Sequence, residues 1–215
     1  MNLFVLKGMY CDDGSEFDFD PGEWTSVGDA QKCKVCGKFI GMLPLVPPIR
    51  GKIEASKSIF DLSGTSGGDI LLSERCLGAF KEHGIQGLTG IHSIELLGIN
   101  APFKKESVGT FYLAGVEWGA ELDRIRSGLK TTGEQVCSDC GYGGLIEGYD
   151  RVAILEESWT GKDLFSIKGL PGVVLTTERV RSLCRTFPLA VCGFVPAEKF
   201  RAPNLSNTLR TDTND

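Results

Sequence analysis

The sequence predicts an α+β fold made of two pseudo-symmetric repeats, each a small sheet that carries one capped helix. Two short motifs indicate this fold, because each of them occurs twice. The motif Cys33-Lys34-Val35-Cys36-Gly37 recurs as Cys137-Ser138-Asp139-Cys140-Gly141, 104 residues later. The segment Ile70–Arg75 recurs as Val174–Arg179, again 104 residues later. Chance can supply either match alone, but a shared offset indicates an internal duplication.

A short helix is expected in each repeat, directly after the second of these motifs. Ser73 and Thr177 suit the N-cap position, where a hydroxyl oxygen accepts a hydrogen bond from a free backbone N–H group. Gly84 and Pro188 follow at matching places and should end the two helices. Residues at helical spacing predict one buried stripe per helix: Cys76, Ala79, Phe80 and His83 in the first, and Val180, Leu183, Cys184 and Phe187 in the second.

β-Rich runs flank both predicted helices. They cover residues 69–72 and 88–97 in the first repeat, and residues 172–175 and 189–195 in the second. A further short helix is suggested by the spacing of Leu122, Ile125 and Leu129. We therefore divide the chain into a first repeat (1–99), a connector (100–110), a second repeat (111–200) and a polar tail (201–215).

Composition and charge are those of an ordinary globular protein with an acidic balance. Of the 215 residues, 41% are hydrophobic and 24% are charged, so a core can form without disulfides. The formal net charge of -5 argues against a general nucleic-acid binder, which needs clustered lysine and arginine. A basic partner is therefore favoured over a polyanionic one.

No export signal or membrane span is predicted. The apolar run at the N-terminus is too short for a signal sequence, and the longest apolar stretch, Phe39–Ile49, is interrupted by three prolines. We expect a cytoplasmic protein that makes no contact with a membrane. In that reducing compartment the eight cysteines should serve as metal ligands or core residues rather than form structural disulfides.

The two Cys-x-x-Cys-Gly motifs predict a metal site. Both thiolates of such a turn can reach one ion, and the glycine accepts the positive φ angle that the turn often demands. A tetrahedral zinc site made of four thiolates needs two of these turns. Two repeats packed about a pseudo-twofold axis would place one structural Zn²⁺ among Cys33, Cys36, Cys137 and Cys140. A redox-active cysteine pair and ordinary buried thiols are the alternatives.

The remaining cysteines and the histidines are expected to be structural. Cys76 and Cys184 belong to the helical stripes, Cys192 belongs to the last predicted strand, and Cys11 is kept as a spare metal ligand. His83 should end a helix, and His92 lies in a predicted strand. The sequence contains no phosphate-binding loop, dinucleotide fingerprint or His-Glu-x-x-His motif. We therefore expect no catalytic residue and no enzymatic activity.

An acidic and aromatic segment lies near the N-terminus. Residues 8–31 contain neither lysine nor arginine. Carboxylates there can steer a basic partner toward the surface, and an aromatic side chain can anchor it. The expected contact residues are Asp12, Asp13, Glu16, Asp18, Asp20, Glu23 and Trp24. The alternative is a half-buried hairpin strand, in which Phe17 and Phe19 alternate with the carboxylates.

With its paired cysteine motifs, its Ser-Glu-Arg and Thr-Glu-Arg helix starts and the spacing between them, the chain resembles the double-CXXCG motif family of bacterial proteins. The resemblance extends from Cys33 to about Val195. Its sharpest matches are Leu71–Arg75 with Gly84–Leu88, and Leu164–Ile167 running into Val174–Arg179. One departure is the short stretch Lys38–Asp69, which is usually longer in the family. If that stretch sets partner choice, the partner differs from those of the relatives.

Members of that family are regarded as immunity proteins of contact-dependent swarm-inhibition toxin systems. The resemblance implies that the protein binds a cognate toxin in the cytoplasm of the producing cell and blocks it. An acidic immunity protein would associate rapidly with a cationic toxin. Two other functions stay open: a zinc-ribbon-like accessory protein acting with nucleic acid, and a thiol oxidoreductase. For the first of these, the chain offers only isolated basic pairs such as Lys104-Lys105 and Arg124/Arg126.

Overall fold

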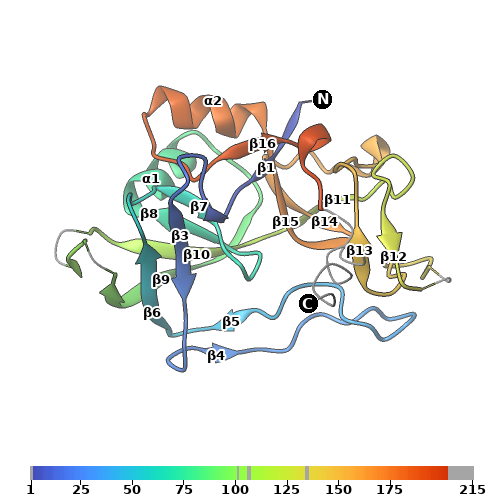
Figure 1. Ribbon diagram of the computed structural model, residues 1–215, viewed down its shortest axis with the longest axis horizontal. Coiled ribbons are helices and arrows are strands. Elements are labelled where there is room, and N and C mark those ends of the chain that lie inside the picture. The colour runs from blue at the N-terminus through green and yellow to red at the C-terminus, as the bar shows by residue number, and fades with distance from the viewer. Residues whose placement is uncertain (1, 101, 106–107, 134–135, 203–215) are drawn as a thin grey trace, which may run out of the picture.

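Two main β-sheets and two α-helices make up most of the mixed α/β structure (Figure 1). The computed structural model describes residues 2–100, 102–105, 108–133 and 136–202, and the following elements are those of the described residues. One sheet has seven strands in the order β2 (Met9–Tyr10), β3 (Glu16–Asp20), β6 (Ile49–Ala55), β9 (Leu88–Ile99), β10 (Phe111–Val116), β8 (Ile70–Ser73) and β7 (Leu62–Gly64). The other has five strands in the order β11 (Trp118–Glu121), β14 (Leu164–Lys168), β15 (Leu170–Thr177), β1 (Leu3–Leu6) and β16 (Phe194–Pro196).

Smaller elements complete the described structure. Two short antiparallel pairs are formed by β4 (Ser26–Val27) with β5 (Leu45–Val46) and by β12 (Lys130–Thr131) with β13 (Ile146–Gly148). The 3₁₀ turns η2 (Glu156–Ser158) and η3 (Ala197–Lys199) lie in the second half of the chain. The predicted polar tail falls mainly on residues 203–215, which lie outside the described residues. Among the described helices, none has the length and apolar character that crossing a membrane requires.

The two α-helices begin and end where the sequence predicts. Helix α1 (Glu74–Glu82) follows Ser73, whose hydroxyl oxygen accepts a hydrogen bond from the N–H group of Cys76 at 3.1 Å. Helix α2 (Glu178–Thr186) follows Thr177, which occupies the N-cap position without making a side-chain cap bond. The Thr177 hydroxyl instead donates to Asp163 at 3.2 Å, so the predicted capping by this hydroxyl is wrong.

The buried stripes of both helices pack into one shared core. Helix α1 buries Cys76, Leu77, Ala79 and Phe80, and helix α2 buries Val180, Leu183 and Cys184. Except for Leu77, these side chains belong to a single hydrophobic cluster that also includes Leu62 and Leu164. His83 does not continue the stripe, because it caps the end of α1 at the surface and stacks on the Phe187 ring at 4.8 Å.

Each main sheet takes one strand from the other side of the predicted connector. Strand β1, the first in the chain, pairs with β15 and β16 in the five-stranded sheet. Strand β10, which follows the connector, pairs with β8 and β9 in the seven-stranded sheet. Leu3 lies opposite the N-cap residue Thr177, and Phe111 lies opposite the N-cap residue Ser73. The sheets are therefore not confined to the two predicted repeats.

Asp61 links the start of helix α1 to the segment that follows helix α2. Its carboxylate accepts hydrogen bonds from the Ser73 hydroxyl at 2.6 Å and the Ala190 N–H group at 2.9 Å, and it pairs with Arg75. The Asp61 N–H group also donates to the Ala190 carbonyl oxygen at 2.6 Å. Burial alone raises the pKa of Asp61, but the bonds from Arg75 and Ser73 outweigh it and leave the pKa below its usual value of 3.8.

Asp163 makes the corresponding set of contacts in the second half. Its carboxylate accepts hydrogen bonds from Thr177 and from the Gln86 N–H group at 3.1 Å, and it pairs with Arg179 at 2.8 Å. Arg179 also donates to the His83 carbonyl oxygen, just beyond the end of helix α1. Each aspartate therefore ties one helix start to the chain that leaves the other helix, and the two halves interlock.

Two sequence predictions of secondary structure are wrong. The segment holding Leu122, Ile125 and Leu129 is a series of turns, and the Ile125 side chain is 93% exposed. Asp123 accepts a hydrogen bond from the Arg126 N–H group, and Gly128 adopts φ +61°, which favours a turn over a helix. The predicted strand at residues 189–195 is reduced to β16, because contacts with Asp61 and β7 hold the residues before it in a loop.

A disulfide between Cys11 and Cys192 contradicts the expectation that structural disulfides are absent. The two Cα atoms lie 4.4 Å apart, and the residues are separated by 181 positions in the sequence. The Asp12 N–H group donates to the Cys192 carbonyl oxygen at 2.8 Å, so the backbones are also joined at this point. Cys11 is therefore not a spare metal ligand, and Cys192 precedes strand β16 rather than lying within a longer strand.

The substitution Asp61→Asn should destabilise the protein by about 1–3 kcal/mol at pH 7, since the half-buried carboxylate loses its ion pair with Arg75 and the charge that strengthens the hydrogen bond from the Ala190 N–H group. The native pKa of Asp61 is depressed, so its contribution is present above the unfolded value of 3.8 and disappears as the pH falls through the folded value. Denaturant unfolding at pH 7 and below pH 4 measures both effects.

The matched control for this prediction is Glu95→Gln, which breaks the exposed pair between Glu95 and Arg50. Exposed pairs contribute little, so this change should cost less than about 1 kcal/mol. Equal losses for the two variants at pH 7 would contradict the role assigned to Asp61.

Candidate metal centre

A long excursion of the chain, residues 21–48, carries the first cysteine turn away from the seven-stranded sheet; we call it the arm. It leaves strand β3 and returns into β6, and the pairing of β4 with β5 joins its two sides. In Figure 1 the arm runs along the lower edge of the molecule toward the second half of the chain. Its far end holds the first cysteine turn (residues 33–37), which meets the second cysteine turn (residues 137–141).

Both cysteine turns have the same backbone conformation. In the first, the Gly37 N–H group donates to the Cys33 carbonyl oxygen at 2.9 Å, and Gly37 has φ +69°. In the second, the Gly141 N–H group donates to the Cys137 carbonyl oxygen at 3.0 Å, and Gly141 also has φ +69°. The prediction that each glycine adopts a positive φ angle is confirmed. An L side chain at either position would be strained.

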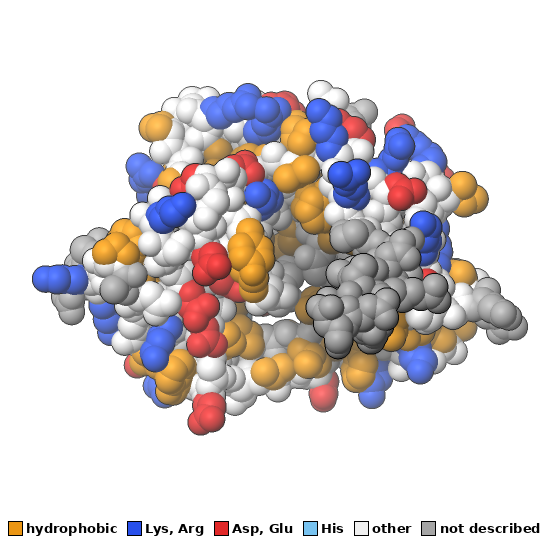
Figure 2. Space-filling model, viewed as in Figure 1, with side chains coloured by type: hydrophobic (Ala, Val, Ile, Leu, Met, Phe, Trp, Pro, Cys, Tyr) orange, Lys and Arg blue, Asp and Glu red, His pale blue; other side chains and the backbone are white. Residues whose placement is uncertain are grey.

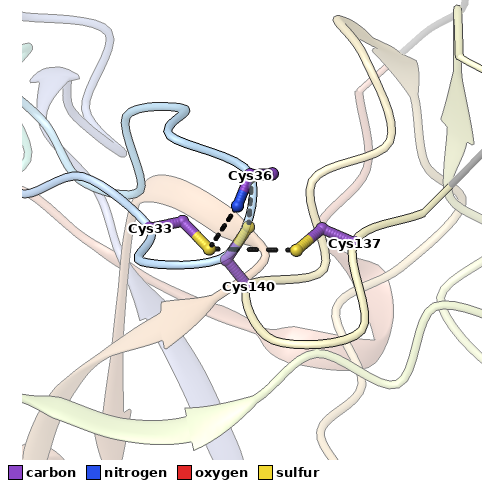
Figure 3. A group of neighbouring side chains, drawn as sticks. All are labelled: Cys33, Cys36, Cys137 and Cys140. Carbon is purple, nitrogen blue, oxygen red and sulfur yellow. Dashed lines mark hydrogen bonds between the residues drawn. The ribbon is translucent and has the colours of Figure 1, made fainter.

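The four thiols of the two turns converge on one point (Figure 3). The sulfur atoms of Cys33, Cys36, Cys137 and Cys140 all lie within 4.8 Å of one another. The Sγ atoms of Cys33 and Cys137 are 3.8 Å apart, and those of Cys36 and Cys140 are 3.5 Å apart. The predicted meeting of the cysteine pairs is confirmed, and the four side chains can hold a metal ion.

Backbone N–H groups and burial act in opposite directions on these thiols. N–H groups of Cys140 and Asp139 lower the pKa of Cys137 to about 7. Burial raises the pKa of Cys140 to about 12. Cys33 donates to the Asp139 carboxylate at 3.1 Å. A metal cation would favour the thiolate form of all four side chains, and the lysines beside the first turn, Lys32, Lys34 and Lys38, place positive charge nearby.

The geometry of the two cysteine turns can be compared with that of a redox-active cysteine pair, one of the alternatives to a metal site. Redox Cys-x-x-Cys motifs commonly open a helix, whose N-terminus stabilises the reactive thiolate. Here both motifs form turns, and neither continues into a helix. Four cysteine ligands also fill a tetrahedral coordination sphere and leave no position for water or substrate. The arrangement therefore favours a structural metal ion that fastens the arm to the second half.

Only part of the acidic N-terminal segment is exposed to solvent and able to contact a partner. Asp18 is buried and accepts hydrogen bonds from the N–H groups of Phe19 at 2.8 Å and Ser66 at 3.4 Å. Because it serves the fold, Asp18 does not belong to a contact surface as predicted. Phe17 and Phe19 are buried in strand β3, which is the alternative that the sequence pattern had left open.

The other predicted contact residues are at or near the surface. Asp12 pairs with Lys7 at 3.0 Å, and Asp13 accepts two hydrogen bonds from Ser15, which lower its pKa. Asp20 is half-buried and accepts from the Gly22 N–H group, while Glu16 and Glu23 are exposed. Trp24 is exposed and stacks under the Lys52 ammonium group, 5.0 Å from the ring centroid.

The arm also exposes a set of apolar side chains, of which the sequence analysis singled out only Trp24. Their exposed fractions lie between 41% and 67%, and they are Trp24, Val27, Val35, Phe39, Met42, Leu43 and Val46. Figure 2 shows hydrophobic side chains along the arm at the lower edge of the view. The signal was present in the proline-interrupted apolar stretch 39–49, which is too apolar for an ordinary surface loop.

Comparisons with known proteins identify no relative. No protein-family model matches the chain, and a search of curated proteins found no similar sequence. The metal centre therefore rests on the geometry of its four thiols.

Replacing one ligand should remove the metal. We expect the full-length protein to retain about one metal ion per chain after gel filtration, and Cys33→Ser or Cys140→Ser to retain almost none. Elemental analysis measures the ratio. The control is Cys184→Ala, which truncates a buried thiol of helix α2 outside the cluster and should destabilise the protein without releasing the ion. Equal metal content in all these variants would contradict the assignment.

Proposed function

We propose that the four cysteines hold one structural Zn²⁺ ion and that the protein is a binding protein, an immunity protein that neutralises a cognate toxin. The observation that carries the proposal is the joining of the apolar arm to the second half through a closed set of four thiols. Such a site can fix a contact surface in place, and it offers no open coordination position for catalysis.

Zinc suits the sulfur geometry. A regular tetrahedron with Zn–S bonds of about 2.3 Å places neighbouring sulfur atoms about 3.8 Å apart. The two Sγ–Sγ distances of 3.8 Å and 3.5 Å are close to that value. Zinc has no redox chemistry and is the common ion of structural four-cysteine sites. Elemental analysis of the purified protein distinguishes zinc from iron.

The arm has the properties of a docking surface for a basic protein. It combines exposed apolar side chains with the exposed carboxylates of Glu23 and Asp29. Apolar contacts supply binding energy once water is excluded, while carboxylates accelerate the encounter with a cationic partner. A toxin bound in the cytoplasm of the producing cell is the partner that the family resemblance implies.

A nucleic-acid partner is the second candidate, because Lys32, Lys34 and Lys38 surround the first cysteine turn. Lys32 and Lys38 lie over the rings of Phe39 and Tyr142, at 5.0 Å and 6.0 Å from the ring centroids. The net charge of -5 opposes this candidate, since phosphate contacts need a wide basic surface. Retention of the protein on DNA or RNA at low salt, lost at high salt, would favour it over a toxin partner.

Replacing two exposed apolar side chains of the arm by serine should weaken toxin binding. We expect Trp24→Ser combined with Leu43→Ser to raise the Kd for the protein encoded by the adjacent reading frame by about tenfold or more, because anchor side chains at an interface centre carry most of its energy. Calorimetric titration with the metal-loaded, full-length chain measures the Kd. Ile125→Ser, at an exposed position outside the arm, should leave the Kd unchanged. Identical affinities for both variants would remove the arm from the interface.

The proposed cytoplasmic location has a separate test. Disulfides such as Cys11–Cys192 are rare in reducing compartments. When producing cells are lysed in denaturant that contains an alkylating agent, a cytoplasmic protein should be labelled at both of these buried cysteines, and mass spectrometry of the purified chain measures the labelling. An intact disulfide with no label at either cysteine would place the protein in an oxidising compartment.

A further inference from the structure

A cavity of about 320 Å³ lies where the arm passes over the two main sheets. The arm forms one wall with Met42, Leu43 and Pro44. The opposite walls come from the β7–β8 turn, the start of β9, the end of β10, the start of β11, the middle of β14 and the β15 segment at residues 171–172. Figure 2 shows the surface hollowed between the arm and the rest of the molecule.

The arm is held against these sheets by a close approach of glycines. A Cβ atom at Gly68 would lie 3.1 Å from the Met42 side chain and 3.1 Å from the Cα atom of Gly172. Gly68 and Gly172 have φ +81° and +83°, so their backbones suit glycine for a second reason. Glycine at these two positions therefore allows the close approach of the arm and the β15 segment to the β7–β8 turn at one wall of the cavity.

The charged groups that line the cavity are two carboxylates, Asp29 and Asp69. The lining includes no lysine, arginine or histidine among the described residues. Asp29 is exposed at the arm, whereas Asp69 is half-buried at the end of the β7–β8 turn. Thr65 fixes the position of Asp69 by donating from its N–H and hydroxyl groups to the Asp69 carbonyl oxygen at 2.9 Å and 3.2 Å.

Among the described residues, no hydrogen bond or ion pair acts on the half-buried Asp69 carboxyl group. Burial therefore acts on it alone and raises its pKa to about 6. An unpaired carboxylate of this kind destabilises a fold, and an asparagine or an apolar residue would avoid the penalty. Costly polar groups of this kind are concentrated at functional sites.

We propose that the cavity receives a lysine or arginine side chain of the protein partner, with its charged end at Asp69 and its aliphatic stem between the arm and Trp118. Lysine and arginine join a cation to a long apolar stem, and the cavity joins carboxylates to apolar walls. A divalent metal ion suits it less, because calcium takes six to eight oxygen ligands. The identity of the ligand as a protein rests on the proposed function.

The exposed surface of the arm continues from the mouth of this cavity. Met42 and Leu43 line the cavity and are themselves 45% and 54% exposed. A partner that covers the arm would exclude water from the pocket, and the ion pair with Asp69 would then form in a less polar environment. Desolvated anchors at an interface centre that are ringed by apolar contacts contribute most to affinity.

The experiment is an NMR titration of the isotopically labelled, metal-loaded, full-length protein at pH 7.5. The probe is Nα-acetyl-arginine methylamide, and the neutral control probe is Nα-acetyl-norleucine methylamide. We expect saturable shifts of the Gly67 and Gly115 amide signals and of the Trp118 indole signal with the arginine probe alone. The absence of shifts at these signals, or equal shifts with the neutral probe, overturns the proposal.

Substitutions can test the Asp69 charge and the volume of the cavity separately. Asp69→Asn should weaken binding of the arginine probe by tenfold or more while raising the melting temperature at pH 7.5, because the buried charge is removed. Gly41→Leu keeps the carboxylate, and its Cβ atom has Trp118 at 3.8 Å as its nearest contact, so the larger side chain should narrow the cavity and weaken binding as well. Glu82→Gln, at the exposed end of helix α1, is the matched control and should leave binding of the arginine probe unchanged.

Binding of the arginine probe should weaken as the pH falls. The Asp69 carboxyl group is ionised above its pKa of about 6, so the arginine probe should bind about tenfold more weakly at pH 5 than at pH 7.5. Asp29, the other titratable group of the lining, is exposed at the arm. If the Asp69→Asn variant binds the arginine probe with unchanged affinity, the probe binds at another site and the proposal is overturned.

These outcomes are independent of the toxin experiment. Binding of the arginine probe together with failure to bind the toxin would remove the proposed function and leave a cation-binding cavity. Toxin binding that Asp69→Asn leaves unchanged would remove the cavity from the interface and leave the proposed function. Saturation by spermidine, with no response to the arginine probe, would overturn the assignment to a protein side chain.

Discussion

Two pairs of thiols that are 104 residues apart lie within 4.8 Å of one another, where they could hold one metal ion, and this convergence depends on the rest of the structure. A Cys-x-x-Cys turn places two sulfur atoms together by local geometry alone. The approach of one turn to the other requires an arm of defined length and a fixed relation between the two sheets. The metal centre is thus the place where local and long-range structure have to agree.

The fixed relation comes from interlocking rather than from a simple contact between two bodies. Strands β1 and β10 each complete a sheet on the other side of the connector, and both helices bury their apolar faces in one core. Asp61 and Asp163 then join each helix start to the chain beyond the other helix. Because these contacts are reciprocal, neither half can rotate without breaking bonds in both.

Local features of the sequence were sufficient to predict the cysteine turns, the glycines with positive φ angles, and the limits of both helices. They were insufficient for the strand order, because the run Leu3–Leu6 indicates a buried strand without indicating its neighbours. The Cys11–Cys192 disulfide and the buried Asp18 were missed for the same reason, since each depends on residues distant in the chain. The unpaired carboxyl group of Asp69 is likewise visible only after folding.

The placement of β1 has a consequence for biosynthesis. This strand is translated more than 160 residues before β15 and β16, the two strands between which it lies. The apolar Leu3–Leu6 segment must therefore wait, exposed or held by a chaperone, until β15 and β16 have been made. Nascent chains arrested before residue 170 would lack a native partner for their own N-terminus.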